Sequence, residues 1–70
     1  MMPLAMAEVG EELIIQRIGG KAATQKHLEN LGFVAGGSVT VLNTVSGNLI
    51  VKVKEARVAI SQEMAMKIMI

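Results

Sequence analysis

One stretch, residues 28–39, most constrains the fold, because it contains a helix end, the only aromatic residue and a reversal of the chain. Leu28 and Leu31 lie three residues apart and therefore share one helix face. Gly32 follows at the position where helices commonly end in a left-handed residue, a conformation that glycine adopts without steric penalty. Phe33 comes next, where a hydrophobic side chain often folds back onto the last helical turn. The stretch predicts a corner between a helix and a strand, closed by Phe33.

The residues before this corner predict a helix from Ala22 to Leu31. Thr24, Leu28 and Leu31 form a narrow stripe along it. A narrow stripe is typical of a helix that lies across a barrel rather than inside a bundle. The side chains that we expect to face water are those of Lys21, Gln25, Lys26 and Glu29.

Short strand patterns occupy the rest of the chain. A β-branched run at residues 12–18 predicts one strand, and the glycines at 19–20 predict a turn into the helix. Valines alternate from Val39 to Val45 with Asn43 on the valine face, a mismatch that indicates a bulge or an edge. The other elements that the pattern predicts are strands at residues 49–54 and 58–60 joined by a hairpin turn at residues 55–56, a helical turn capped by Ser61, and a last strand at residues 68–70.

These elements predict a single mainly β domain, residues 1–70, built as a small barrel of about five strands with one inserted α-helix and a short helical turn before the last strand. Hydrophobic residues form 51% of the chain, and closure into a barrel removes sheet edges that such a chain cannot leave exposed. The last strand is too short to stand alone and must pair with an earlier one. We expect Leu4 and Val9 to cover the open end of the barrel, and Leu31 to lie in the core.

The order Leu-x-x-Leu-Gly-Phe-x-x-Gly-x-x-Val at residues 28–39 resembles the central signature of the FeoA family, small proteins of bacterial ferrous-iron uptake. The other segments that carry the similarity are Pro3-Leu4, Val9-Gly10, Ile18-Gly19-Gly20, Val58-Ala59-Ile60 and residues 65–70. The chain departs from the family's pattern at Ala35 and Asn48, where proline is common. The resemblance implies an SH3-like barrel and, at the level of the family, transition-metal ion binding.

The sequence offers no constellation for catalysis, so we expect neither an enzyme nor a cofactor. Nucleophilic catalysis needs a base with an orienting partner, whereas this chain has one histidine, no cysteine and no aspartate. The adjacent carboxylates Glu11 and Glu12 point to opposite faces of a strand. His27 alone makes a poor metal site, so we expect no metal ligands within one chain; a site shared within an oligomer stays open.

A binding module is the class that remains. The resemblance implies a cytoplasmic accessory or regulatory protein that binds the GTP-binding cytosolic part of the FeoB transporter. No apolar run in the chain is long enough to span a bilayer. One alternative is a free-standing regulatory barrel like that of iron-dependent repressors. The other is a small barrel that binds nucleic acid through Lys52 and Lys54, against which we count the lack of aromatic stacking platforms. A homo-oligomer is compatible with all three.

The partner surface is expected to combine basic and methionine side chains. A basic edge would steer the protein toward an acidic partner. Six methionines are many for 70 residues, and their flexible, polarizable side chains suit adaptable apolar contacts. The residues predicted to contact the partner are Lys21, Lys26, Arg57 and Met64.

Overall fold

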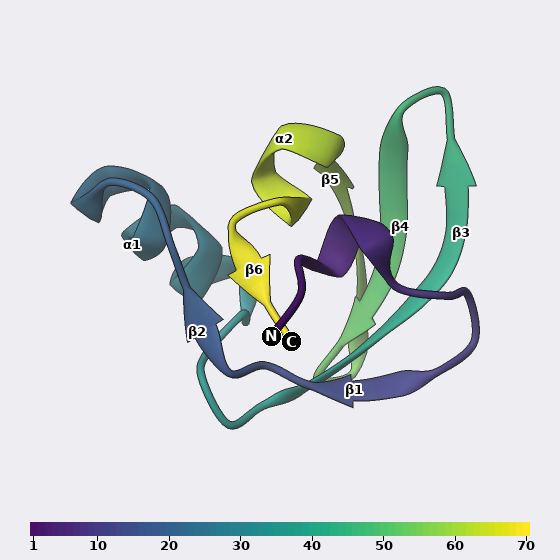
Figure 1. Ribbon diagram of the computed structural model, residues 1–70, viewed down its shortest axis with the longest axis horizontal. Coiled ribbons are helices and arrows are strands. Elements are labelled where there is room, and N and C mark those ends of the chain that lie inside the picture. Colours follow the sequence, from purple (N-terminus) through teal and green to yellow (C-terminus); the bar gives the residue numbers. More distant parts are fainter.

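The computed structural model describes every residue from 1 to 70 and arranges six short strands, two helices and a 3-10 turn around one core (Figure 1). The elements, in chain order, are η1 (Leu4–Met6), β1 (Glu12–Ile14), β2 (Arg17–Ile18), α1 (Ala22–Leu31), β3 (Ser38–Val45), β4 (Asn48–Val53), β5 (Ala56–Ser61), α2 (Gln62–Ala65) and β6 (Ile68–Met69). The mainly β class, the inserted helix and the helical turn before the last strand are confirmed.

The strands form two antiparallel sheets, one in the order β1-β3-β4-β5 and one of β2 with β6. The single strand predicted at residues 12–18 is wrong, because the chain passes from one sheet to the other at Ile15. The Ile15 N–H donates to the Gly37 carbonyl at 2.8 Å, and the Ile15 carbonyl accepts from the Gly36 N–H at 2.7 Å. One residue later, the Gln16 N–H donates to the Met69 carbonyl at 2.7 Å. The last strand therefore pairs with an earlier one, as predicted.

The hairpin of β3 and β4 contains the predicted bulge. The register shifts between Val41 and Asn43, and the Thr44 N–H donates to Oδ1 of Asn43 at 2.8 Å. An extra residue in one strand exchanges the two faces beyond it. Thr44 therefore lies opposite the buried Leu49, and Val45 is 49% exposed although it continues the valine pattern of the sequence.

Helix α1 ends in the corner that the sequence predicts. Gly32 has a φ of 109°, in the left-handed region, and its N–H donates to the carbonyls of Leu28 and Glu29. The Phe33 N–H donates to the Leu28 carbonyl at 2.9 Å. Leu28 and Phe33 are both completely buried, so the last turn of α1 and the residue after it close the same part of the core.

The start of α1 is tied to β2 by a side chain that was expected to face water. Gln25 is half-buried, and its Nε2 donates to the carbonyls of Ile18 at 3.3 Å and Gly20 at 3.1 Å. Ile18 is the last residue of β2, and Gly20 lies in the turn between β2 and α1. The glutamine amide thus orients the helix where no side-chain N-cap is present.

The core is aliphatic except for Phe33. Leu4 is completely buried, as predicted, but Val9 is 56% exposed, so its predicted place over the open end of the barrel is wrong. The Gly10 N–H donates to the Val41 carbonyl at 2.8 Å, which holds this segment along the edge of β3 and leaves η1 as the cover. The buried apolar side chains are Leu4, Ile15, Leu28, Phe33, Val39, Val41, Leu49, Val51, Val53, Ile60, Ala65 and Ile68.

The two leucines of α1 should differ in their contribution to stability. Leu28 has no exposed surface, so Leu28→Ala should lower the free energy of unfolding by about 2–5 kcal/mol through lost burial and a residual cavity. Leu31, expected in the core, is half-buried at its margin, so Leu31→Ala should cost less. Urea unfolding of both variants measures the difference, and a larger loss for Leu31→Ala would contradict the packing described.

Candidate functional site

Two cations lie directly opposite each other on the outer face of the larger sheet. Lys52 of β4 is in register with Arg57 of β5, and both residues are exposed. Their neighbours Val51 and Val53 are buried, so the alternation of the strand directs Lys52 away from the core. Like charges directly opposite each other destabilise an antiparallel pair. A bound anion would remove this repulsion.

A second basic group lies at the amino end of α1. Lys21 is the N-cap residue, and its side chain makes no capping hydrogen bond. The first turn of α1 holds no acidic residue, so the positive end of the helix dipole adjoins an exposed lysine. Lys67 joins this group: a Cβ added at Gly20 would lie 2.8 Å from Cδ of Lys67.

The sequence does not predict that Lys67 lies in this group, because no local pattern connects it with Lys21. The connection comes from the pairing of β2 with β6, which continues as a bond of 2.7 Å from the Gly19 N–H to the Lys67 carbonyl. Only the pairing of two-residue strands brings the two lysines to one end of the helix.

The structure does not gather the predicted basic residues into one surface. Helix α1 has 10 residues, which makes it about 15 Å long. Lys21 lies at its amino end. Its other end, Gly32, lies against the side chain of Lys54 in the turn that leads to Arg57. Lys26 is exposed between the two ends. The cations form two groups, one near each end of α1, instead of one edge.

The methionines divide into packed and exposed ones. Met64 of α2 is half-buried and packs against the core, which leaves part of its surface for a partner. Met6 of η1 is 66% exposed, and Met66, directly after α2, is 48% exposed. The elements η1 and α2 contact each other near the two chain ends (Figure 1). Met6 and Met66 therefore offer more apolar surface than Met64 does.

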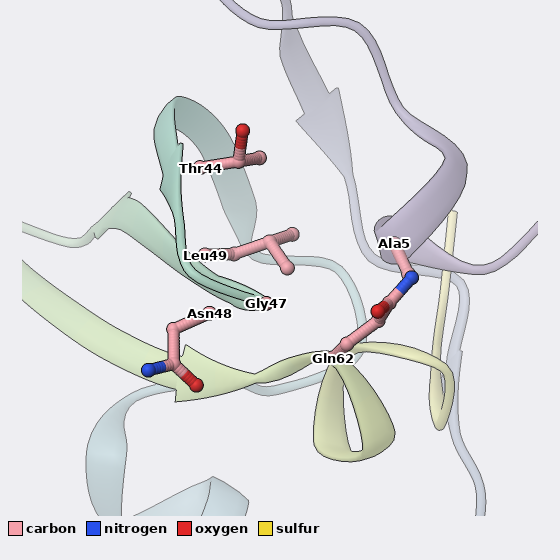
Figure 2. Close-up of a pocket in the computed structure, with 6 residues that line it drawn as sticks. All are labelled: Ala5, Thr44, Gly47, Asn48, Leu49 and Gln62. Carbon is pink, nitrogen blue, oxygen red and sulfur yellow. The ribbon is translucent and has the colours of Figure 1, made fainter.

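A pocket of about 290 Å³ opens where the tip of the β3–β4 hairpin meets η1 and α2 (Figure 2). Figure 2 shows Gln62 reaching from the start of α2 toward Ala5 of η1, with Leu49 pointing into the space from β4. The lining contains amide, hydroxyl and apolar groups and no titratable side chain, so it suits an uncharged group and offers no acid or base. The lining residues are Ala5, Thr44, Gly47, Asn48, Leu49 and Gln62.

The donor set does not fit a metal ion within one chain. His27 is exposed on α1, and no group of three or more histidine, cysteine or carboxylate side chains comes together. Zinc and iron sites are built from several such ligands at once. None of the helices has the length and apolar character needed to cross a membrane.

The repulsion between Lys52 and Arg57 can be measured directly. Arg57→Glu converts the like-charge pair into an opposite-charge pair and should raise the free energy of unfolding by about 0.2–1 kcal/mol at low salt. Arg57→Gln removes the repulsion without adding attraction, so its free energy of unfolding should lie between those of wild type and Arg57→Glu. Urea unfolding at low and high salt tests both variants. A loss of stability in Arg57→Glu at low salt would mean that the two side chains do not oppose each other as described.

Comparison with known proteins gives the same assignment by sequence and by structure. The family model of the FeoA domain matches residues 2–70. The "Putative Fe(2+) transport protein A" of Methanocaldococcus jannaschii is 34% identical over 70 residues, which cover 100% of this chain and 85% of that protein. A crystal structure of the iron uptake regulatory protein FeoA is 25% identical, with a TM-score of 0.87 over 94% of this chain and 89% of that chain.

More distant structures share the fold. FeoA of Stenotrophomonas maltophilia, solved with zinc and described as an SH3 domain protein, has a TM-score of 0.83 at 22% identity, covering 97% of this chain and 87% of that one. A manganese-dependent transcriptional repressor has a TM-score of 0.85 at 19% identity, covering 94% of this chain but 38% of the repressor. The SH3-like barrel implied by the sequence resemblance is confirmed, and with the match over residues 2–70 the chain belongs to the FeoA family.

Proposed function

We propose that this chain is a cytoplasmic accessory protein of ferrous-iron uptake, which acts by binding the GTP-binding cytosolic part of a FeoB-type transporter. The observation that carries the proposal is the family match over residues 2–70, together with a relative over the full chain whose name is Fe(2+) transport protein A. Iron is the cargo of the transporter in this proposal and not a ligand held by one chain, since the donor set offers no cluster for it.

A binding role, without catalysis, suits the surface chemistry. The pocket is lined by amide, hydroxyl and apolar groups and has no titratable side chain to act as an acid or a base. Two of the exposed cations lie beside other positive charge: Arg57 lies opposite Lys52, and Lys21 adjoins the positive end of the α1 dipole. Both placements oppose folding stability. Their cost is offset when an acidic partner binds, which is the reason we assign these residues to the partner surface.

The nucleic-acid alternative has no comparable support. Proteins that bind single strands without sequence preference stack bases on exposed aromatic side chains. Phe33 is the only aromatic residue and is completely buried. The repressor alternative rests on likeness of fold at 19% identity, which carries no role for this chain.

An amide NMR titration of the labelled protein with the soluble GTP-binding domain of the cognate transporter tests the proposal. We expect localised shifts at the exposed cations, on β4–β5 or at the amino end of α1. The titration is repeated with ferrous iron, kept reduced, and with single-stranded DNA. Absence of shifts with the domain, together with salt-sensitive shifts at Lys52 and Lys54 on adding DNA, would overturn the proposal in favour of nucleic acid.

Charge variants then assign the surface. Arg57→Glu should slow association and weaken its dependence on salt, because rim cations act mainly through electrostatic steering. Lys21→Glu does the same if the amino end of α1 is the contact. Arg57→Lys keeps the charge and serves as the matched control. Since Arg57→Glu is expected to stabilise the fold, its loss of binding could not be attributed to unfolding. Association rates equal to wild type in both charge reversals would remove the basic groups from the interface.

A further inference from the structure

The larger sheet ends in an unpaired strand. In the order β1-β3-β4-β5, strand β5 has β4 on one side and no strand on the other. Its six residues, Ala56–Ser61, are all paired with β4. No backbone group of Arg57, Ala59 or Ser61 takes part in the turn, loop and cap hydrogen bonds of the chain.

The alternation of bonded and non-bonded pairs along the β4–β5 ladder shows which backbone groups of β5 have no partner. The Gln62 N–H donates to the Gly47 carbonyl at 3.1 Å, which continues the bonded pairs of the β4–β5 ladder. Bonded and non-bonded pairs alternate along an antiparallel ladder. The bonded pairs therefore contain Ala56, Val58 and Ile60. Between them, Arg57 and Ala59 direct both N–H and carbonyl away from β4, and both residues are exposed.

The side chains at this edge select what can pair with it. Arg57 projects from the open strand with Lys52 directly opposite it, and in the adjoining turn the charges of Lys54 and Glu55 cancel. Ala59 is the other outward residue and leaves room for an incoming side chain. A strand added at this edge would place alternate side chains beside Arg57. Carboxylates at those positions would relieve the repulsion between Lys52 and Arg57.

The opposite edge of the same sheet supplies an internal contrast. Strand β1 pairs only with β3, and its exposed edge residues are Glu12 and Ile14. Glu11 precedes them and is also exposed. The sheet thus has one basic and one acidic edge. An acidic segment is attracted to β5 and repelled by β1.

We propose that the open edge of β5 captures an extended acidic segment of a partner protein as an added strand. The backbone of Arg57 and Ala59 supplies the hydrogen bonds, and Lys52 and Arg57 supply the charge complement. This inference rests on the proposed function as a protein-binding module and names the surface and the chemistry of its partner. The β1 edge of a second copy is also acidic, but it is only three residues long, whereas a free segment can follow the whole of β5.

The probe is a short blocked peptide in which glutamate alternates with valine. Two control peptides carry lysine in place of glutamate, or one central proline that prevents an extended strand. We expect the first peptide alone to shift the amides of β5 and to slow hydrogen exchange at Arg57 and Ala59, because their N–H groups become bonded. Ion pairing by itself would shift amides without protecting them. Shifts without protection would overturn strand addition.

Two variants, Ala59→Pro and Arg57→Glu, with Ala59→Val as a control, locate the binding on β5. Ala59→Pro removes an N–H that points away from β4 and should weaken peptide binding about tenfold, whereas Ala59→Val keeps the N–H and should bind as wild type. Arg57→Glu should also lose binding while the fold stays intact. Should Ala59→Pro disturb the fold, Arg57→Glu still decides the matter. Peptide binding unchanged in Arg57→Glu, or shifts centred on β1, would overturn the inference, as would self-association through β5 that the peptide does not compete with.

Ala59→Pro and the peptide together distinguish a failure of this inference from a failure of the proposed function. If the GTP-binding domain of the transporter binds Ala59→Pro as it binds wild type, and the peptide protects neither Arg57 nor Ala59, strand addition at β5 is wrong and the accessory role stands. If the domain does not bind wild type while the peptide protects Arg57 and Ala59, the acidic-strand site stands and the transporter is not its partner.

Discussion

The backbone around Ile15 holds the two sheets together, and much of the fold depends on it. Ile15 exchanges two hydrogen bonds with the Gly36–Gly37 turn, and Gln16 then bonds to Met69 in the last strand. These bonds join the first strand of the larger sheet, the corner after α1 and the end of the chain. The Ile15 side chain is buried. Ile15 and Gln16 lie between β1 and β2, and their backbone hydrogen bonds tie the larger sheet to the smaller one.

The corner after α1 was predictable because its determinants are local. A glycine at the helix end and a phenylalanine after it specify a left-handed cap and a buried plug, and the structure has both at Gly32 and Phe33. The bounds of α1 and the Ser61 cap, whose Oγ accepts from the Met64 N–H at 3.1 Å, are equally local features. Each can be read from a few neighbouring residues.

The features that could not be predicted from the sequence all depend on pairing between segments that are far apart in the chain. The division of residues 12–18 follows from bonds to Gly37 and Met69, and the exposure of Val45 follows from a bulge whose effect on the faces is set by β4. The pocket is assembled from η1, two strands and α2, and its residues share no pattern. The same holds for the candidate site: the exposure of Arg57 could be inferred from alternation, but its pairing with Lys52 needs the register of the hairpin.

Closure into a barrel was expected to remove sheet edges, yet β1 and β5 remain edges because closure is made by β2 and β6 in a separate sheet. An exposed edge in a hydrophobic chain invites unwanted pairing, and charged side chains on it are a common protection. Protection alone needs one charge on the edge strand. Here a second cation, Lys52, stands on the paired strand, where it adds no protection to the edge and repels Arg57. Lys52 and Arg57 lie together at a cost to stability. An acidic partner explains this placement better than protection of the edge against unwanted pairing does.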